Sequence, residues 1–211
     1  MTPTAALERG LQQLGIALTA ETRARLLQYI ALLAKWNRTY NLTAVRDAEA
    51  MVSHHLLDAL AVLPHLPLPH EARVADAGSG GGLPGIPLAM ARPQWHVALV
   101  ESNQKKCAFL RQAVIELALA NVEVHEGRVE RWQPQTPFAL VISRAFTQLA
   151  QFIEACRHLV APRGLFAAMK GKQPRDELDE LPGDVQCKAV IALRTPFVDA
   201  ERHLVLCELR S

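Results

Sequence analysis

Apolar positions recur every three or four residues through the first third of the chain, and this spacing predicts helices over residues 4–63. In the clearest case, residues 21–40, one predicted face carries Leu26, Ile30, Leu33 and Asn37. A second helix is expected to begin at Asp47, a good N-terminal capping residue, and to run to Leu63. Three prolines in residues 64–70 cannot continue a helix, so this segment is predicted to be a linker.

After the linker, short apolar runs, partly β-branched, alternate with helical patterns. Helices are predicted at residues 103–120 and 148–160. Strands are predicted at 74–77, 96–101, 122–127, 138–143, 165–170, 188–193 and 203–209. This alternation indicates an α/β protein with a parallel sheet covered by helices on both faces. The expected organisation is a helical extension, residues 1–63, packed on a second unit, residues 71–211.

Composition narrows the class of protein. The 211 residues carry a formal net charge of only +2, which excludes a strongly basic nucleic-acid-binding tail but allows one local basic face. No apolar run approaches the roughly 18–20 residues of a membrane span, and the first residues do not resemble a signal peptide, so a cytoplasmic protein is expected. The four cysteines have no zinc-ligand spacing and are expected to be reduced and packed; no metal site is predicted.

The segment that follows the strand at 74–77 is rich in glycine, with five glycines in residues 78–85. Such a loop allows a sharp turn and close approach of a ligand to the backbone. A nucleoside-triphosphate loop would need Lys and Ser or Thr after Gly85, where Ile86 and Pro87 stand instead. A dinucleotide fingerprint can be threaded through Gly80, Gly82 and Gly85, and a loop beneath S-adenosylmethionine fits equally well.

Glu101 lies at the end of the next predicted strand, about twenty residues after the loop. An acid there accepts hydrogen bonds from the ribose hydroxyls of an adenosine ligand, in NAD and S-adenosylmethionine proteins alike. The residues after 127 suffice for one sheet only, which favours S-adenosylmethionine over NAD. The alternatives are an NAD-dependent oxidoreductase, a methyltransferase acting on a protein or small molecule, and a non-catalytic RNA-binding module.

Several motifs together resemble one known family. Beyond the glycine loop DAGSGGGLPGIPLA they are WN…YNLTA (residues 36–44), HHLLD (54–58), GRVE (127–130), ISRAF (142–146), MKG (169–171) and ERHLV (201–205). Their content and order are similar to the RsmG (GidB) family, over roughly residues 20–209. Ala59 departs from the pattern, which often has Ser. The resemblance implies a class I methyltransferase (Rossmann-like) fold with a seven-stranded, mostly parallel sheet and helices on both faces, formed by residues 71–211.

The resemblance also implies an activity: transfer of a methyl group from S-adenosylmethionine to N7 of a guanosine at position 527, in the 530 loop of bacterial 16S rRNA. The expected substrate is this RNA in the small ribosomal subunit, and the expected state is a monomer. Carried over by motif, Gly78 and Leu83 would contact the cofactor, Val129 and Glu130 would flank its adenine, and Arg144 would reach the cofactor or the target. With Gly80 and Glu101, these are the predicted cofactor-binding residues.

Guanine N7 has a free lone pair and loses no proton before attack, so the reaction requires alignment more than a general base. No catalytic group is therefore assigned; the positioning candidates are Arg144, Lys170 and His55. Phe146 either stacks on the target base or packs in the core. Lys170 belongs to a basic cluster with Lys172 and Arg175 that either contacts RNA phosphates or is merely solvated. His54 and Asp58, four residues apart, are expected to form a pair.

Overall fold

The computed structural model describes residues 1–144, 146 and 148–210. One sheet has the strand order β3-β2-β1-β4-β5-β7-β6. The strands are β1 (Arg73–Ala77), β2 (His96–Glu101), β3 (Val122–Glu126), β4 (Phe138–Ser143), β5 (Val160–Lys170), β6 (Val185–Ala192) and β7 (His203–Leu209). β1 to β5 pair in parallel, and β7 runs antiparallel to both β5 and β6. The predicted seven-stranded, mostly parallel sheet is therefore confirmed.

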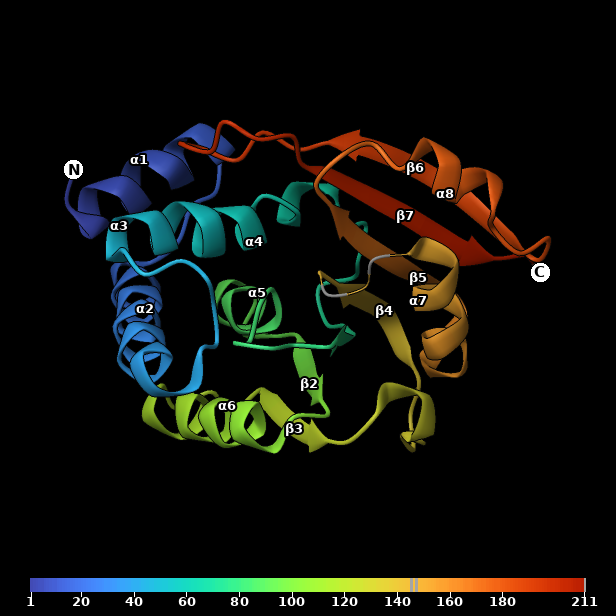
Figure 1. Cartoon of the computed structure of the whole chain (residues 1–211), viewed down its shortest axis with the longest axis horizontal. Helices are drawn as coiled ribbons and strands as arrows, with labels where there is room; N and C mark the ends of the chain where they lie inside the picture. The colour runs from blue at the N-terminus through green and yellow to red at the C-terminus, as the bar shows by residue number, and fades with distance from the viewer. Residues whose placement is uncertain (145, 147, 211) are drawn as a thin grey trace.

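Helices cover both faces of this sheet, as predicted (Figure 1). Val74 and Ala75, adjacent in β1, belong to different hydrophobic clusters because successive strand residues point to opposite faces. The first cluster joins the sheet to the N-terminal helices, α5 (Gly85–Ala91) and α6 (Gln104–Glu116). The second joins it to α7 (Leu149–Cys156), the 3-10 turns η3 (Val129–Arg131) and η4 (Arg157–Leu159), and α8 (Arg175–Asp179).

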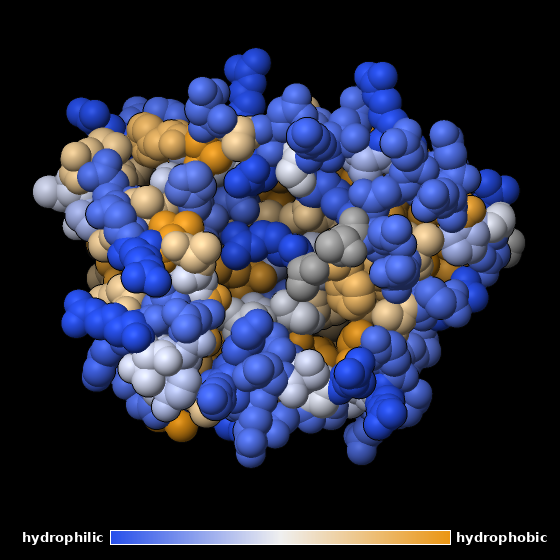
Figure 2. Space-filling view, in the orientation of Figure 1, coloured by the Kyte–Doolittle hydropathy of each residue, from blue (hydrophilic) through white to orange (hydrophobic). Residues whose placement is uncertain are grey.

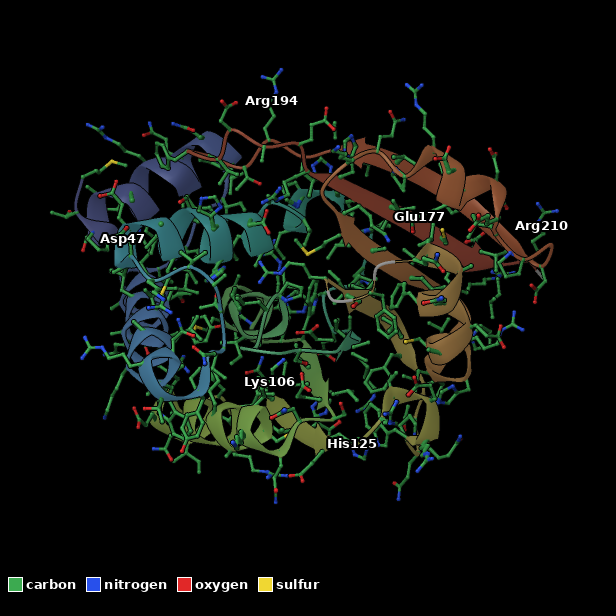
Figure 3. All side chains as sticks on the ribbon, in the orientation of Figure 1. Asp47, Lys106, His125, Glu177, Arg194 and Arg210 are labelled. Atoms are coloured by element: carbon green, nitrogen blue, oxygen red, sulfur yellow. The ribbon has the colours of Figure 1, made fainter. Side chains whose placement is uncertain are left out.

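The N-terminal segment is helical, as predicted, and consists of α1 (Pro3–Leu14), α2 (Ala20–Tyr40), α3 (Ala48–Met51), the π-helical turn η1 (Val52–Leu57), α4 (Asp58–Leu60) and the 3-10 turn η2 (Leu63–His65). The predicted face of α2 is buried. Asp47, labelled in Figure 3, caps α3 by accepting the N–H of Ala50 at 2.7 Å. These helices share one core with the sheet, and the Trp36 ring packs 5.7 Å from that of Phe109 in α6.

Two strands begin earlier than predicted, β5 at Val160 instead of residue 165 and β6 at Val185 instead of residue 188, and three predicted helix ends were wrong. The helix expected to reach Leu63 ends at Leu60, because Pro64 has no N–H to donate to the Leu60 carbonyl, and the 3-10 turn η2 follows. The helix expected at 103–120 ends at Glu116, because Ala118 adopts a left-handed backbone. The helix expected at 148–160 ends at Cys156, because Val160 already pairs with Phe138 at the start of β5.

Two further observations concern cysteines and hydropathy. Cys107, Cys156 and Cys207 are buried free thiols, as expected, and Cys187 is half-buried. Within the part of the chain that the structure describes, no helix combines the length and apolar character needed to cross a membrane.

Candidate active site

The glycine loop after β1 is held from two sides. Gly78 and Gly80 have φ of 73° and 58°, in the left-handed region that glycine adopts without strain. From the sheet, the Asp76 carboxylate accepts the N–H of Gly85 at 2.9 Å. From the N-terminal extension, the hydroxyl of Tyr29 in α2 donates to the carbonyl of Gly81 at 2.5 Å. The extension is therefore part of the support of the loop.

Glu101 ends β2 beside this loop and is 7% exposed, so it is not a solvated strand end. One carboxylate oxygen accepts the N–H of Gly80 at 2.9 Å, and the other accepts the N–H of Asn103 at 2.8 Å. A carboxylate offers about four acceptor positions. Two therefore remain for hydroxyl groups of a ligand.

A cavity of about 120 Å³ opens next to Glu101. Its lining residues are Gly78, Val100, Glu101, Ser102, Gly127, Arg128, Val129, Glu130 and Phe146. The structure thus brings together four of the predicted cofactor residues, Gly78, Glu101, Val129 and Glu130. A carboxylate among apolar side chains fits the ribose and adenine of an adenosine ligand. The two other predicted loop residues, Leu83 and Gly80, do not line this adenosine cavity. The side chain of Leu83 is buried in the core, and Gly80 is linked to the cavity through its hydrogen bond to Glu101.

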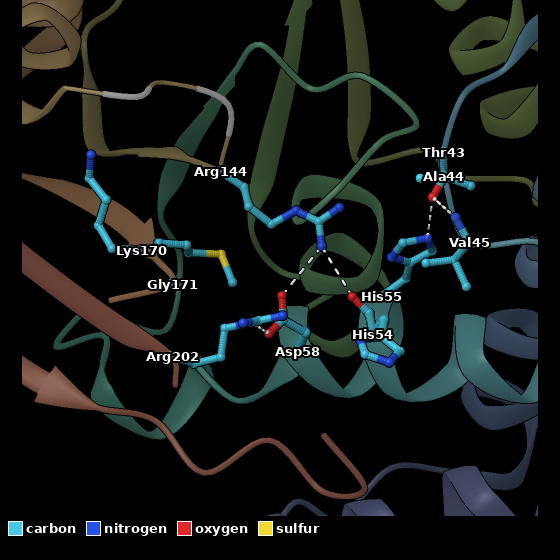
Figure 4. A pocket seen from close by; sticks show the side chains of 11 residues that line it. Thr43, Ala44, Val45, His54, His55, Asp58, Arg144, Lys170, Gly171 and Arg202 are labelled. Carbon is cyan, nitrogen blue, oxygen red and sulfur yellow. Dashed lines mark hydrogen bonds and ion pairs between the residues drawn. The ribbon is translucent and has the colours of Figure 1, made fainter. Parts of the chain in front are cut away.

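A larger cavity of about 370 Å³ collects residues from five separate sequence motifs (Figure 4). Its lining residues are Thr43, Ala44, Val45, His54, His55, Asp58, Arg144, Met169, Lys170, Gly171 and Arg202. We call it the arginine cavity. All three positioning candidates line it. Thr43 and Arg202 were not singled out from the sequence, although both lie within the quoted motifs.

Asp58 is the centre of a hydrogen-bond network on the wall of the arginine cavity. Its Oδ1 accepts Arg202 Nε at 2.9 Å and Thr195 Oγ1 at 3.3 Å, and its Oδ2 accepts Arg144 Nη1 at 3.3 Å. The predicted pair with His54 is therefore wrong. Hydrogen bonds from charged guanidinium groups to a carboxylate are strong. The two arginines lie 86 and 144 residues from Asp58, so local sequence spacing could not reveal them as its partners.

His55 contacts the segment that follows α2. Its Nε2 lies 2.8 Å from the hydroxyl oxygen of Thr43, and Asn37 accepts the Thr43 N–H at 2.8 Å. Burial and, to a lesser extent, the nearby positive charge of Arg144 together lower the pKa of His55 to about 4. The imidazole is therefore neutral near pH 7.

A third depression, of about 460 Å³, adjoins the arginine cavity. Its lining residues are Arg144, Phe146, Met169, Lys170, Gly171, Lys172, Gln173, Pro174, Arg175, Asp176 and Glu177. Lys170 is nearly buried and pairs with Glu177 at 2.7 Å, a partner that the sequence did not reveal. Figure 2, in the orientation of Figure 1, shows a hollow near the middle of the molecule with both hydrophilic and hydrophobic residues around it.

Phe146 connects the adenosine cavity to the third depression, because it lines both. The centre of its ring also lies 5.4 Å from that of the buried Phe152, so Phe146 takes part in core packing, which was one of its two predicted roles. Ala145 of the ISRAF motif lies outside the described residues. Arg144 and Phe146 thus lie between the adenosine cavity and the two cavities that contain the basic residues.

The strand order with a reversed β7, the glycine loop after β1 and the acid that ends β2 define a class I methyltransferase. The family model described as rRNA small subunit methyltransferase G matches residues 22–205. The chain therefore belongs to this family, and its methyl donor is S-adenosylmethionine.

Relatives and solved structures agree with this assignment. The chain is 51% identical over 204 residues to ribosomal RNA small subunit methyltransferase G of Laribacter hongkongensis, covering 97% of each chain. It is 53% identical over 203 residues to the protein of that name from Chromobacterium violaceum, covering 96% of each. In fold it is similar to the O-methyltransferase TomG from Streptomyces achromogenes in complex with SAM, with a TM-score of 0.58, 17% identity, and 87% and 90% of the two chains covered.

Proposed function

We propose that this protein transfers a methyl group from S-adenosylmethionine to N7 of a guanosine in the 530 loop of 16S rRNA, at position 527. The observation that carries the proposal is the arginine cavity, where five of the family-like motifs converge. Arg144 of this cavity stands two positions before Phe146, which lines the adenosine cavity. The names of the relatives support small-subunit ribosomal RNA as the substrate. The position and the atom rest on the resemblance of the motifs.

The residues of the arginine cavity fit a reaction that needs orientation and no general base. S-adenosylmethionine supplies an activated methyl group, and guanine N7 supplies a lone pair without losing a proton. Methylation at N7 leaves a positive charge on the guanine ring. The neutral His55 adds no charge beside it, and Asp58 offsets part of the charge of Arg144 and Arg202. The side chains of this cavity would hold the base and its backbone in line with the methyl group.

Residue roles follow from the same geometry. In our proposal, Glu101 receives the ribose hydroxyls, Val129 and Glu130 flank the adenine, and Arg144 reaches the cofactor or the target nucleotide. The glycine loop passes beneath the methionine part through Gly78, Gly80 and the backbone of Leu83, whose side chain is buried in the core. Lys170 and His55 act by positioning.

The organisation of the protein is part of the proposal. Residues 1–63 form an extension that packs on a methyltransferase domain, residues 71–211. We propose that the protein acts as a monomer in the cytoplasm, on RNA within the small ribosomal subunit. The shared core and the Tyr29 bond to the glycine loop support a functional role for the extension.

The direct test uses methyl-labelled S-adenosylmethionine and small subunits from cells that lack the endogenous N7 methylation. The RNA is digested and the labelled nucleoside is identified and mapped. We expect 7-methylguanosine within the 530 loop. Label in another nucleoside would leave the enzyme class standing and contradict the target, whereas failure to bind S-adenosylmethionine would contradict the assignment of the adenosine cavity.

A further inference from the structure

Asp58 joins three parts of the chain at the arginine cavity. It lies in the N-terminal extension and is 2% exposed, while Arg144 follows β4 and Arg202 precedes β7. Both of its carboxylate oxygens accept hydrogen bonds from these arginines. A carboxylate buried so completely is maintained only because its partners compensate the loss of water.

Arg144 donates hydrogen bonds to η1 and α4 through one nitrogen of its guanidinium group, Nη1. Nη1 donates to Asp58 Oδ2 and to the carbonyl of His54, both at 3.3 Å (Figure 4). Among the described residues, Nε and Nη2 of Arg144 have no hydrogen-bond or ion-pair partner. These two nitrogens carry parallel N–H groups along one edge, a geometry that matches two oxygens of one anion. The side chain is 30% exposed, so this edge is open to a ligand.

We propose that Asp58 is a positioning residue for methyl transfer: it fixes Arg144 so that its free Nε–Nη2 edge receives a phosphate of the target nucleotide. This inference rests on the proposed function, because it assigns part of the RNA substrate to a particular residue. Asp58 itself does not touch the reacting atoms. It acts through Arg144 and holds the guanidinium from the side away from the substrate.

A phosphate is the partner that the chemistry favours. An arginine that binds guanine with two hydrogen bonds uses O6 and N7, but N7 must stay free to attack the methyl group. A cation directly against the ring would also oppose the positive charge that methylation creates. The charge of Lys170 is offset by its partner Glu177, so Arg144, Arg202 and Asp58 leave one net positive charge, which suits one phosphate oxyanion.

The position of Arg144 separates this role from cofactor binding. Arg144 lines the arginine cavity and the third depression, whereas the adenosine cavity is lined by other residues. The nearby Lys170 is already paired with Glu177, so it is less available than Arg144 to hold an anion. A cofactor carboxylate bound by Arg144 is the alternative that the experiment must distinguish.

Thr195 provides a matched control. It donates to Oδ1 of Asp58 at 3.3 Å, as Arg202 does, whereas Arg144 donates to Oδ2. Thr195 does not line any of the three cavities described. Thr195→Val removes this bond and leaves the contact between Asp58 and Arg144 intact. It reports how much activity is lost when the Asp58 network is merely weakened.

The test compares Asp58→Asn, Arg144→Gln, the double variant and Thr195→Val. Steady-state methylation of unmethylated small subunits gives kcat and KM, and calorimetry gives the Kd for S-adenosylmethionine. We expect each of the first two variants to lose on the order of 100-fold in kcat/KM for subunits, because the target is misplaced. The double variant should fall no more than about threefold below the lower single variant, because both changes remove one interaction. Cofactor Kd should stay within about threefold of the wild type in every variant, and Thr195→Val should lose much less activity than Asp58→Asn, because it leaves the bond between Asp58 and Arg144 in place.

Salt dependence identifies the bound group. Loss of one phosphate contact should reduce the slope of log affinity for subunits against log KCl by about 0.7–0.9 in Arg144→Gln, at constant Mg²⁺. An unchanged slope would contradict a phosphate, and a weakened cofactor Kd in Arg144→Gln would assign the edge to the cofactor carboxylate.

Additive losses in the double variant would show that Asp58 does not act through Arg144. If Asp58→Asn does not fold, Asp58→Glu keeps the charge and displaces Arg144 by one methylene, with the same expected loss for subunits. If the wild-type protein methylates subunits and the Asp58 and Arg144 variants are as active as the wild type, only this inference is overturned. Wild-type protein that labels no subunit RNA would overturn the proposed function.

Discussion

At the residue scale, Glu101 shows how one side chain combines two requirements. The sequence predicted an acid at the end of the second strand that meets a ribose. The structure adds that the same carboxylate holds the backbone N–H groups of Gly80 and Asn103. The sequence did not predict these bonds, because they depend on how the loop folds back over β2.

Glu101→Gln is therefore expected to weaken S-adenosylmethionine binding by about 10- to 100-fold, since hydrogen bonds to a charged acceptor contribute roughly 1.5–3 kcal/mol. Calorimetric titration with S-adenosylmethionine measures this. Glu116→Gln, an exposed site in α6, is the matched control and should bind as the wild type does. Equal affinities of the two variants would remove Glu101 from the cofactor site.

His55 is the second residue with a chemical consequence, because its folded pKa of about 4 lies below the ordinary value of 6.5. Between these values the unfolded chain binds more protons than the folded chain, so the free energy of unfolding decreases as pH falls through this window. The stabilisation is complete above pH 6.5. Asp76 acts in the opposite sense, since burial raises its pKa to about 7.

A comparison of the wild type with His55→Gln cancels the contribution of Asp76. The stability advantage of the wild type should be constant above pH 6.5 and smaller by roughly 2 kcal/mol at pH 5. Urea denaturation between pH 5 and 8 measures it. A difference that does not change with pH would mean that His55 becomes protonated in the folded protein as it does in the unfolded one.

At the element scale, periodicity located the helices and strands, and local events set their ends. The buried face of α2 followed from three- and four-residue spacing. The left-handed Ala118 and the pairing of Val160 with Phe138 are tertiary or backbone events that leave little trace in such patterns. The π-helical turn η1, which carries His54 and His55, was not predicted either, because the sequence pattern was compared with the α-helical period of 3.6 residues.

Helix α2 has a functional contact that follows from its place over the sheet. Tyr29→Phe removes the hydroxyl that donates to Gly81, so we expect about 1–2 kcal/mol lower stability and several-fold weaker S-adenosylmethionine binding. Denaturation and calorimetry measure the two effects. Tyr40→Phe, at the exposed end of the same helix, is the control and should change neither. Loss of stability with unchanged cofactor affinity would limit Tyr29 to a packing role.

At the scale of the whole molecule, one hydrophobic core unites the N-terminal helices with the sheet. Leu33 of α2 and Leu57 of η1 belong to the same buried cluster as Leu99 of β2. An extension with so much shared core is expected to unfold together with the domain on which it packs.

This cooperativity is testable with single-tryptophan proteins. Trp95→Phe/Trp132→Phe leaves Trp36 in α2, and Trp36→Phe/Trp95→Phe leaves Trp132 beside the sheet. For each protein, the fluorescence midpoint in urea should coincide with the midpoint of its circular dichroism transition. If Trp36 reports an earlier transition than circular dichroism does, the extension unfolds separately.

The sequence by itself determined the order of the elements, the glycine loop, the acid after β2 and the family-like motifs, because these features depend on local spacing and on residue type. Only the tertiary structure decided which distant side chains meet. Asp58 contacts Arg144 and Arg202 across 86 and 144 residues, and Lys170 is neutralised by Glu177. Such pairs are set by the order of the strands and by burial, which turn separate stretches of sequence into the walls of one cavity.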